Sequence, residues 1–354
     1  MGKPTTKILT LLVVIITLTL LSCAKEGEKN SNGKPKLYLY NWSYYTPDEV
    51  IASFEKEYGV DVVLDYFASN EEMYAKLKAS KKSGYDIIFP SGDYVSIMIA
   101  QGMLEPLDTS AMDNLVYITD FAKEKSTYDP TMQYSVPYYL GASGIAVHTK
   151  MAKDYERSWS IFGDKRFADR MVMMDDMREV LGDGLVTLGY SVNTTDPAQI
   201  LEAQELIDKK WKPNLVKFDA EAFAKGFASG EYWVSHGYAE AIFEEIDEKL
   251  WGEVDFFLPE EGGPMYIDAM CIPKGAPHYE LALQFINYMH RPDNYAKLLD
   301  RFHFPASVNT EADKYRTTVP FYTIEQPQNY ELKEDLGPAL RLYNSAWEKI
   351  RYVN

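Results

Sequence analysis

The chain has 354 residues, of which 46% are apolar and 25% charged, and this composition excludes a disordered or fibrous protein and allows two hydrophobic cores. Its net charge of −17 makes nucleic acid and anionic membrane surfaces poor partners. The chain has only two cysteines, so no disulfide framework is expected and the fold must rely on its cores.

Residues 1–22 have the pattern of a secretory signal peptide. Two lysines precede an uncharged apolar run from Ile8 to Leu21, which is too short to span a bilayer comfortably. The run ends at "LLSC", and a polar tract follows; this resembles the cleavage and acylation box of bacterial lipoproteins. We therefore expect Cys23 to become the lipidated first residue, with residues 23–35 as a flexible tether. A plain signal peptide with an incidental cysteine is the alternative.

The segment after the tether alternates between strand and helix patterns. Strands are expected at 36–41, 60–66 and 85–90, and helices at 47–58 and 69–82. This βαβαβ order implies a parallel sheet. Each helix is expected to begin with a capping box, formed by Thr46 with Glu49 and by Ser69 with Glu72.

Helical and apolar patterns alternate again further along the chain and predict a second α/β unit. Helices are expected at 176–188, 197–210, 221–227 and 238–250, with short strands at 170–174, 231–236 and 254–259. The C-terminal helix should bury one face made of Leu340, Tyr343, Trp347 and Ile350. Cys271 lies in an apolar run typical of a strand and should be a buried thiol.

The motifs of common enzymes are mostly missing. No glycine-rich dinucleotide motif follows the first strand, no phosphate-binding loop is present, and the histidines lack metal-ligand spacing. Ser143 does not have the pattern of a nucleophile elbow. We therefore expect no cofactor, no metal and no enzymatic activity.

Aromatic and polar residues follow two of the expected strands. Trp42 and Tyr45 come after the first strand, and Ser91 and Asp93 come after the third. In open α/β sheets ligands bind beyond the carboxyl ends of the strands, so both loops should face one crevice. Aromatic faces attract cations and cover methylene groups, and together with carboxylates they favour a site for an organic amine. Packing of these rings within a core or between domains is the alternative.

Three acids further along the chain are also candidate ligands. Asp176 and Glu179 stand three residues apart at an expected helix start, where they could equally form a capping box. Asp268 is the only charge between Glu261 and Lys274 and interrupts an apolar strand. A carboxylate at such a position needs a buried donor or a ligand cation as its partner.

Several segments, in this order, resemble the spermidine/putrescine-binding proteins of bacterial polyamine ABC importers. They are "YNWSYYTP", "SNEEMYAKLK", "YDIIFPSGDYV", "YSVPYYLGASGIAV", "DDMREVLGDGLVTLGYSVNTTDP" and "MYIDAMCIP", and the similarity extends from Lys36 to the C-terminus. The resemblance implies an α/β fold of the two-domain, type II periplasmic-binding-protein class, with a central, mostly parallel sheet in each domain and closure on the ligand like a Venus flytrap. The first domain is expected to comprise residues 36–140 and 268–310, and the second residues 141–267 and 311–354, with chain crossings near Gly141, Asp268 and Glu311.

The same resemblance implies a site of rings and acids between the domains. The contacts it implies are Trp42, Ser43, Tyr45, Ser91, Asp176, Glu179 and Asp268. Asp176 and Glu179 would hold one terminal ammonium, and Asp268 would pair with another amine. Ser43 is closer to the putrescine-binding branch of the family, which favours putrescine at least as much as spermidine.

Some positions depart from the family pattern. The wall tryptophans of the family correspond here to Tyr238 and Tyr266, and a tyrosine beside the serine corresponds to Asp93. A further tyrosine and a glutamine of the spermidine binders correspond to Phe304 and Lys333. Fewer polar partners at that end weaken the expected recognition of a third amine, and a lysine near a cationic ligand is unfavourable unless it points away.

The expected function is an extracytoplasmic receptor that binds putrescine or spermidine and delivers it to the permease subunits of an ABC importer. It would be lipid-anchored to the inner membrane and face the periplasm. The alternatives are a sugar or amino-acid receptor of the same fold, a surface adhesin without a ligand, and a glycoside hydrolase. The hydrolase would use two of Asp93, Asp176, Glu179 and Asp268 as its carboxylate pair.

Overall fold

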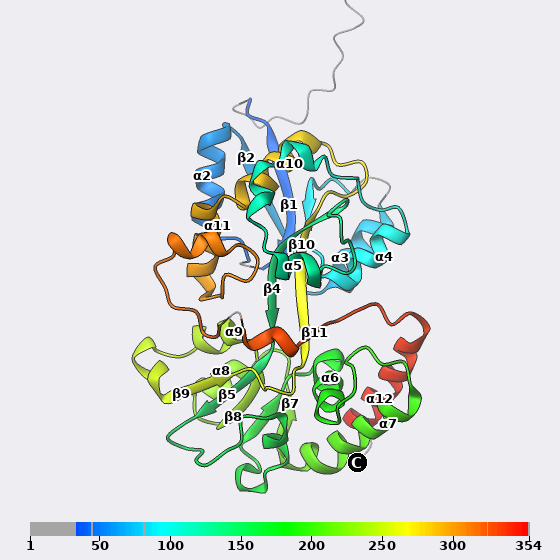
Figure 1. Ribbon diagram of the computed structural model, residues 1–354, viewed down its shortest axis with the longest axis vertical. Helices are drawn as coiled ribbons and strands as arrows, with labels where there is room; N and C mark the ends of the chain where they lie inside the picture. Colours follow the sequence, from blue (N-terminus) through cyan, green and yellow to red (C-terminus); the bar gives the residue numbers. More distant parts are fainter. Residues whose placement is uncertain (1–32, 44, 81–82, 324, 353–354) are drawn as a thin grey trace, which may run out of the picture.

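The computed structural model describes residues 33–43, 45–80, 83–323 and 325–352. The expected signal peptide, Cys23 and most of the tether lie outside these ranges. Within the described part of the chain, no helix is both long enough and apolar enough to cross a membrane. Two sheets, each accompanied by helices, lie at opposite ends of an elongated molecule (Figure 1).

The first sheet contains the strands expected directly after the tether. Its order is β11-β10-β3-β1-β2, and β4 pairs with β10 outside this path. The strands are β1 (Lys36–Trp42), β2 (Asp61–Phe67), β3 (Ile87–Ile88), β4 (Ser135–Ala142), β10 (Pro264–Cys271) and β11 (Glu331–Leu332). β1 pairs in parallel with β2 and β3, which confirms the βαβαβ prediction. β10 runs antiparallel to β3 and β4, so the complete sheet is mixed.

Helices pack around the first sheet and bury its apolar residues. They are α2 (Asp48–Tyr58), α3 (Asn70–Ala79), α4 (Gly92–Ala100), α5 (Asp120–Lys125), α10 (Tyr279–Met289) and α11 (Pro292–Phe302). Val50 and Phe54 of α2 belong to the same buried cluster as Leu37 and Leu39 of β1, because the apolar residues of the helix recur on one face. Cys271, at the end of β10, is fully buried as predicted.

The two expected capping boxes have different outcomes. Ser69 accepts a 3.2 Å hydrogen bond from the Glu72 N–H and caps α3, as predicted. The other capping box is wrong, because α2 begins after Pro47 without a side-chain cap. Thr46 Oγ1 instead accepts a 2.8 Å hydrogen bond from the buried Asn41 amide, which would otherwise have no acceptor there.

The second α/β unit is also present and has its own sheet, with the order β7-β6-β8-β5-β9. The strands are β5 (Gly144–His148), β6 (Met171–Met173), β7 (Leu215–Phe218), β8 (Val234–Gly237) and β9 (Val254–Phe257). β6 pairs in parallel with β7 and β8, whereas β5 runs antiparallel to β8 and β9. The strand ends of β6 and β8 therefore point the same way.

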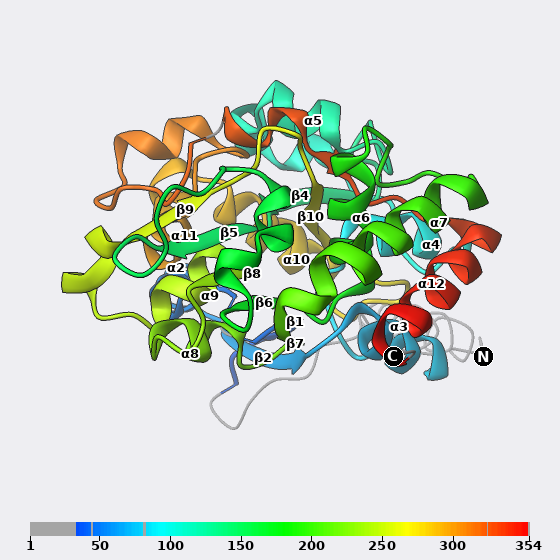
Figure 2. The same ribbon diagram turned by 90° about the horizontal axis from the view of Figure 1, so that it is seen from below.

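Five α-helices accompany the second sheet in the described chain. They are α6 (Met177–Thr187), α7 (Pro197–Leu206), α8 (Phe223–Ala228), α9 (Ala239–Glu244) and α12 (Leu340–Tyr352). The helix expected at 238–250 is thus shorter than predicted. α6, α7 and α12 pack on one another along one flank (Figure 2). In α12, Tyr343 and Ile350 are buried and Trp347 is half-buried, but Leu340 is exposed, so one residue of the predicted face is wrong.

Three chain segments lie side by side where the two sheets meet (Figure 1). β4 is separated from β5 by Ser143 alone, so the chain passes directly from one sheet to the other. At the same level, Met265 and Tyr266 of β10 pair with Ala142 and Gly141 of β4. β11 pairs with the beginning of β10 there. Because the two sheets meet at this junction, both of them contribute walls to the cavity that lies between them.

Candidate functional site

A cavity of about 640 Å³ lies between the two sheets. Its lining comes from the end of β1, the segments that follow β1, β2, β3, β6, β7 and β8, β10 itself, and the residue after β11. This is where open α/β sheets bind ligands, because parallel strands end at a common edge. Most of the predicted ligand contacts line it, namely Trp42, Tyr45, Ser91, Asp93, Asp176, Tyr238, Tyr266, Asp268 and Lys333.

Aromatic rings form two parts of the cavity wall. Trp42 is fixed at the end of β1 because its Nε1 donates to the Phe89 carbonyl at 2.9 Å and its ring packs on Phe67, with the centroids 4.5 Å apart. Tyr238, before α9, and Tyr266, in β10, meet edge to face at 5.6 Å. Such rings present negative potential to a cation and apolar surface to methylene groups.

Asp268 is the carboxylate that β10 contributes to the cavity. It is 5% exposed, and Ser91 Oγ donates to its Oδ1 at 2.6 Å. Asn70 holds Ser91 in place through two hydrogen bonds, from its Nδ2 to Ser91 Oγ at 3.0 Å and from the Ser91 N–H to its Oδ1 at 3.1 Å. Burial raises the pKa of Asp268 to about 6, and the Ser91 hydroxyl opposes that shift. Ser91 is thus a half-buried donor to this carboxylate, which the sequence predicted would need a partner.

Glu240, in the first turn of α9, lines the same cavity and was missed in the sequence. Desolvation at the cavity wall raises its pKa to about 7, and the neighbouring Asp268 carboxylate acts in the same direction. The signal was available, because Glu240 closely follows the end of β8. It was overlooked because an acid in the first turn of a helix is ordinarily explained by the helix dipole.

Asp176 caps α6 and lines the cavity at the same time. Its Oδ1 accepts hydrogen bonds from the N–H groups of Arg178, at 2.8 Å, and Glu179, at 3.1 Å. The cap predicted from the sequence is therefore confirmed. Asp176 lies in the cavity because it belongs to the short segment between the end of β6 and the start of α6, at the strand-end edge.

Glu179 was expected to hold a ligand ammonium beside Asp176, but its carboxylate has partners inside the protein. It is fully buried and is not among the described residues that line the cavity. It accepts hydrogen bonds from Ser143 Oγ at 2.7 Å, the Tyr238 hydroxyl at 3.3 Å and Lys333 Nζ at 2.5 Å. The acceptor expected for the ligand is thus occupied by a lysine of the chain.

Lys333 follows β11 and lines the cavity instead of pointing away from it. Burial acts to lower its pKa, but Glu179 and Asp176 more than offset this, so the pKa lies above the usual range for lysine. The ammonium is therefore charged at neutral pH. Asp93, also in the cavity, has its pKa raised by burial, and Lys333 opposes that shift.

Two predicted contacts lie elsewhere. Ser43 is exposed and is not among the described residues that line the cavity. Phe304 is buried and stacks on Tyr139, with ring centroids 3.6 Å apart and planes at 11°. Tyr139 in turn contacts Tyr266 at 6.1 Å, so Phe304 supports the ring wall from behind. Its lack of a hydroxyl fits this apolar position.

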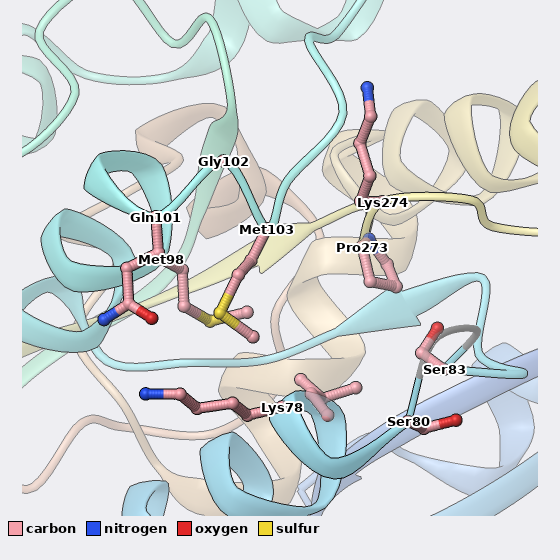
Figure 3. Close-up of a pocket in the computed structure, with 10 residues that line it drawn as sticks. Lys78, Ser80, Ser83, Met98, Gln101, Gly102, Met103, Pro273 and Lys274 are labelled. Atoms are coloured by element: carbon pink, nitrogen blue, oxygen red, sulfur yellow. The ribbon is translucent and has the colours of Figure 1, made fainter.

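A second, smaller cavity of about 320 Å³ is formed by the end of α3, the end of α4 and the segment after β10 (Figure 3). Met98 and Met103 lie within it, and Lys78 and Lys274 lie on two of its sides. Its described lining includes neither a carboxylate nor an aromatic ring. The described lining thus offers an amine no anionic acceptor, so the larger cavity is the better candidate.

Ser143, His236 and Asp183 lie together behind the larger cavity without forming a catalytic triad. Ser143 Oγ is 2.9 Å from His236 Nε2, and Asp183 Oδ2 is 3.5 Å from the same nitrogen. A triad needs the acid on the other ring nitrogen, and all three residues are fully buried. Among the described residues, no group of three or more histidine, cysteine, aspartate or glutamate side chains could hold a metal.

Comparisons with known proteins identify the family and the fold of the chain. Residues 49–321 match the family model described as bacterial extracellular solute-binding protein. The chain is 33% identical to the spermidine/putrescine-binding periplasmic protein 1 of Haemophilus influenzae over 95% of this chain and 96% of that protein. It is also 33% identical to the putrescine/cadaverine-binding protein of Pseudomonas aeruginosa, over 80% and 82%.

The solved structure of the TpPotD lipoprotein of Treponema pallidum has the same fold. It superposes with a TM-score of 0.87 at 48% sequence identity, over 90% of this chain and 99% of that chain. Substrate-binding proteins of ABC transporters recur among the other similar structures. The mixed α/β architecture with two sheets is therefore the two-domain periplasmic-binding-protein fold, and the chain belongs to the family of bacterial extracellular solute-binding proteins.

Proposed function

We propose that this protein is a polyamine receptor that binds putrescine or spermidine between its two domains and delivers it to an ABC importer. The observation that carries the proposal is the charge of the cavity. Among the described residues, its lining contains six carboxylates, from Glu71, Asp93, Asp175, Asp176, Glu240 and Asp268, and two cationic side chains, Arg178 and Lys333. Asp175 pairs with Arg351 outside the lining, and the acids still outnumber the cations. A surplus of acids beside aromatic rings suits a flexible organic cation.

Each part of a polyamine has a suitable partner in this cavity. Protonated amines need anionic acceptors, which Asp268 supplies from the first sheet and Asp176 from the second. Trp42 and Tyr266 offer apolar surface to the methylene groups, and each buried methylene contributes about 0.8 kcal/mol. Closure around the ligand would neutralise acids on both sides, whereas closure without it would bury them unpaired.

The alternatives fit the cavity less well. A neutral sugar would leave the surplus carboxylates without counter-charges. A hydrolase would need two carboxyl groups free to act on a glycosidic bond, but Glu179 is buried in three hydrogen bonds, Asp176 caps a helix and Asp268 accepts from Ser91, so within the described chain only Asp93 of the four candidates lacks such a role. The names of the relatives, which refer to putrescine, spermidine and cadaverine, support the amine.

We also propose that Cys23 anchors the protein by a lipid to the inner membrane, facing the periplasm, after removal of residues 1–22. The "LLSC" sequence and the similarity to a Treponema pallidum lipoprotein support this. The lipid-anchored receptor would then deliver its ligand to the permease subunits of the importer in the same membrane. We propose that the first domain comprises residues 36–140 and 268–310 and that the second comprises residues 141–267 and 311–354. The hinge would lie at the junction of β4, β10 and β11.

Thermal unfolding of polyamine-stripped protein tests the proposed function. Putrescine should raise the melting temperature in a saturable manner, because a ligand that binds only the folded state stabilises it. N-acetylputrescine, which keeps the methylene chain but loses one charge, should give a much smaller shift, and glucose none. Equal shifts with putrescine and its acetylated form would contradict the proposal.

A further inference from the structure

Ser143 lies where the chain crosses between the two sheets, as the one residue between β4 and β5, and it is fully buried. Its Oγ donates to Glu179 Oε2 at 2.7 Å and lies 2.9 Å from His236 Nε2. A carboxylate can only accept, so the single hydroxyl proton of Ser143 is used by Glu179. The Ser143 oxygen therefore accepts a hydrogen bond from His236.

This direction of hydrogen bonding fixes the tautomer of His236. Burial lowers the pKa of the imidazole to about 3, so at neutral pH the ring is uncharged and its one proton is on Nε2. Its Nδ1 has no hydrogen-bond partner among the described residues, as suits a nitrogen without a proton. Asp183 Oδ2 is 3.5 Å from Nε2, too distant to compete strongly for that proton. Trp159 meets the imidazole edge to face, with the ring centroids 5.2 Å apart.

The Glu179 carboxylate connects these two residues to the cavity wall. Because Ser143 holds its Oε2, its Oε1 is turned toward Lys333 and toward the Tyr238 hydroxyl, which donates at 3.3 Å. Tyr238 directly follows β8, and its ring meets Tyr266 edge to face in the cavity wall. β5 and β8 pair antiparallel, so Ser143, before β5, and Tyr238, after β8, stand at the same end of the two strands.

We propose that Ser143 and His236 are positioning residues of the amine site, which hold the Tyr238 ring in the cavity wall through the Glu179 carboxylate. This inference rests on the proposed function. A hydroxyl is required at position 143, because one atom there must accept from His236 and donate to Glu179 at the same time. Neither Ser143 nor His236 is among the described residues that line the cavity, so both act on affinity through the ring and not by contact with the ligand.

The test is a double-mutant cycle, read by calorimetric titration of polyamine-stripped protein with putrescine. Ser143→Ala should lower the affinity by about fivefold or more, and so should Tyr238→Phe, which keeps the ring but loses the hydroxyl. In the double variant the two losses should overlap, because Ser143 has no hydroxyl left to position through Glu179. Fully additive losses would overturn the inference, since a merely structural effect of Ser143→Ala would not depend on the Tyr238 hydroxyl.

Two replacements of His236 separate its hydrogen bond from its packing. His236→Gln keeps an N–H for Ser143 and should bind putrescine nearly as tightly as the wild type, whereas His236→Leu removes the donor and should be as weak as Ser143→Ala. Ser135→Ala is the matched control. Ser135 is a buried serine at the far end of β4 from the hinge, and its hydroxyl donates to the Asp129 carboxylate at 2.8 Å. This control should leave the affinity unchanged, even if it lowers the melting temperature.

Three other results would overturn the inference. They are wild-type affinity in folded Ser143→Ala, equal weakening by His236→Gln and His236→Leu, and wild-type affinity in Tyr238→Phe. The last result needs no change at the buried positions, so it decides the question even if the Ser143 and His236 variants fail to fold. Failure of the wild type to bind either putrescine or spermidine would instead contradict the proposed function.

Discussion

Ser91 Oγ donates a 2.6 Å hydrogen bond to Asp268 Oδ1 and so joins the start of α4 to the middle of β10 at the cavity wall. The two residues are far apart in the sequence, but they also form a backbone bridge between neighbouring segments. The bond stabilises the charged form of a carboxylate that burial would otherwise protonate. Asp268 is therefore kept closer to the charged form that the proposed binding of a cation requires.

Replacement of Asp268 by Asn should weaken amine binding and leave the fold intact. The amide is nearly the same size and can still bond to Ser91, but it offers no negative charge, so we expect a loss of about 2 kcal/mol in the free energy of binding. Titration calorimetry measures the loss, and thermal unfolding measures the fold. Asp113→Asn, on the exposed surface, is the matched control and should bind like the wild type. Equal affinity of both variants would refute the assigned role.

Amine affinity should fall as the pH is lowered from 8 to 6. The pKa values of Asp268 and Glu240 in the free protein are raised to about 6 and about 7, so both are charged at pH 8, and Glu240 is mostly protonated at pH 6. Only the charged forms attract the ammonium, so we expect about tenfold weaker binding at pH 6. Titrations at several pH values check this, and Glu240→Gln should flatten the curve. A flat curve in the wild type would be the contrary result.

Removal of the Trp42 ring should affect binding more than folding. Trp42 stands at the end of β1 with its Nε1 bonded to the Phe89 carbonyl, and it is only half-buried. Trp42→Ala should weaken amine binding by about 1 to 2 kcal/mol, through loss of cation–π and methylene contact. Trp42→Phe keeps a ring without the N–H and should bind with intermediate strength. If the alanine variant does not fold, the ring serves mainly in packing.

Acid should destabilise the protein partly through His290. Burial lowers the pKa of this imidazole to about 3, whereas an unfolded chain has the ordinary value near 6.5. Below pH 6.5 the unfolded state therefore binds a proton that the folded state does not, and the stability present at pH 7 is lost as the pH falls. At pH 5 this amounts to about 2 kcal/mol. Urea unfolding at pH 7 and 5 should show a smaller loss for His290→Gln than for the wild type; equal losses would exclude this cause.

The strand-end residues could be predicted from the sequence because their position depends on local patterns. The alternation of strands and helices after Lys36 sets parallel strands side by side, and this places Trp42, Ser91 and Asp93 at one edge without knowledge of distant contacts. Asp176 followed from a cap pattern that the structure confirms. Local sequence patterns are therefore enough to predict the positions of these site residues.

The partners of Glu179 and Thr46 could not be predicted in this way. A glutamate at the third helical position can turn back to the cap or inward, and here Ser143 and Lys333, both remote in the sequence, decide for the interior. Likewise, Thr46 serves a buried amide instead of a helix end. Long-range hydrogen bonds outweigh a local preference worth about 1 kcal/mol.

The central claim, that this cavity binds an organic polycation, is tested most directly by calorimetric titration of polyamine-stripped protein without the signal peptide. Putrescine, spermidine, glucose and glutamate would be compared under the same conditions. The account predicts saturable one-to-one binding of at least one of the two amines and no heat of binding for glucose or glutamate. Folded protein that binds neither amine, or that binds glucose instead, would contradict it.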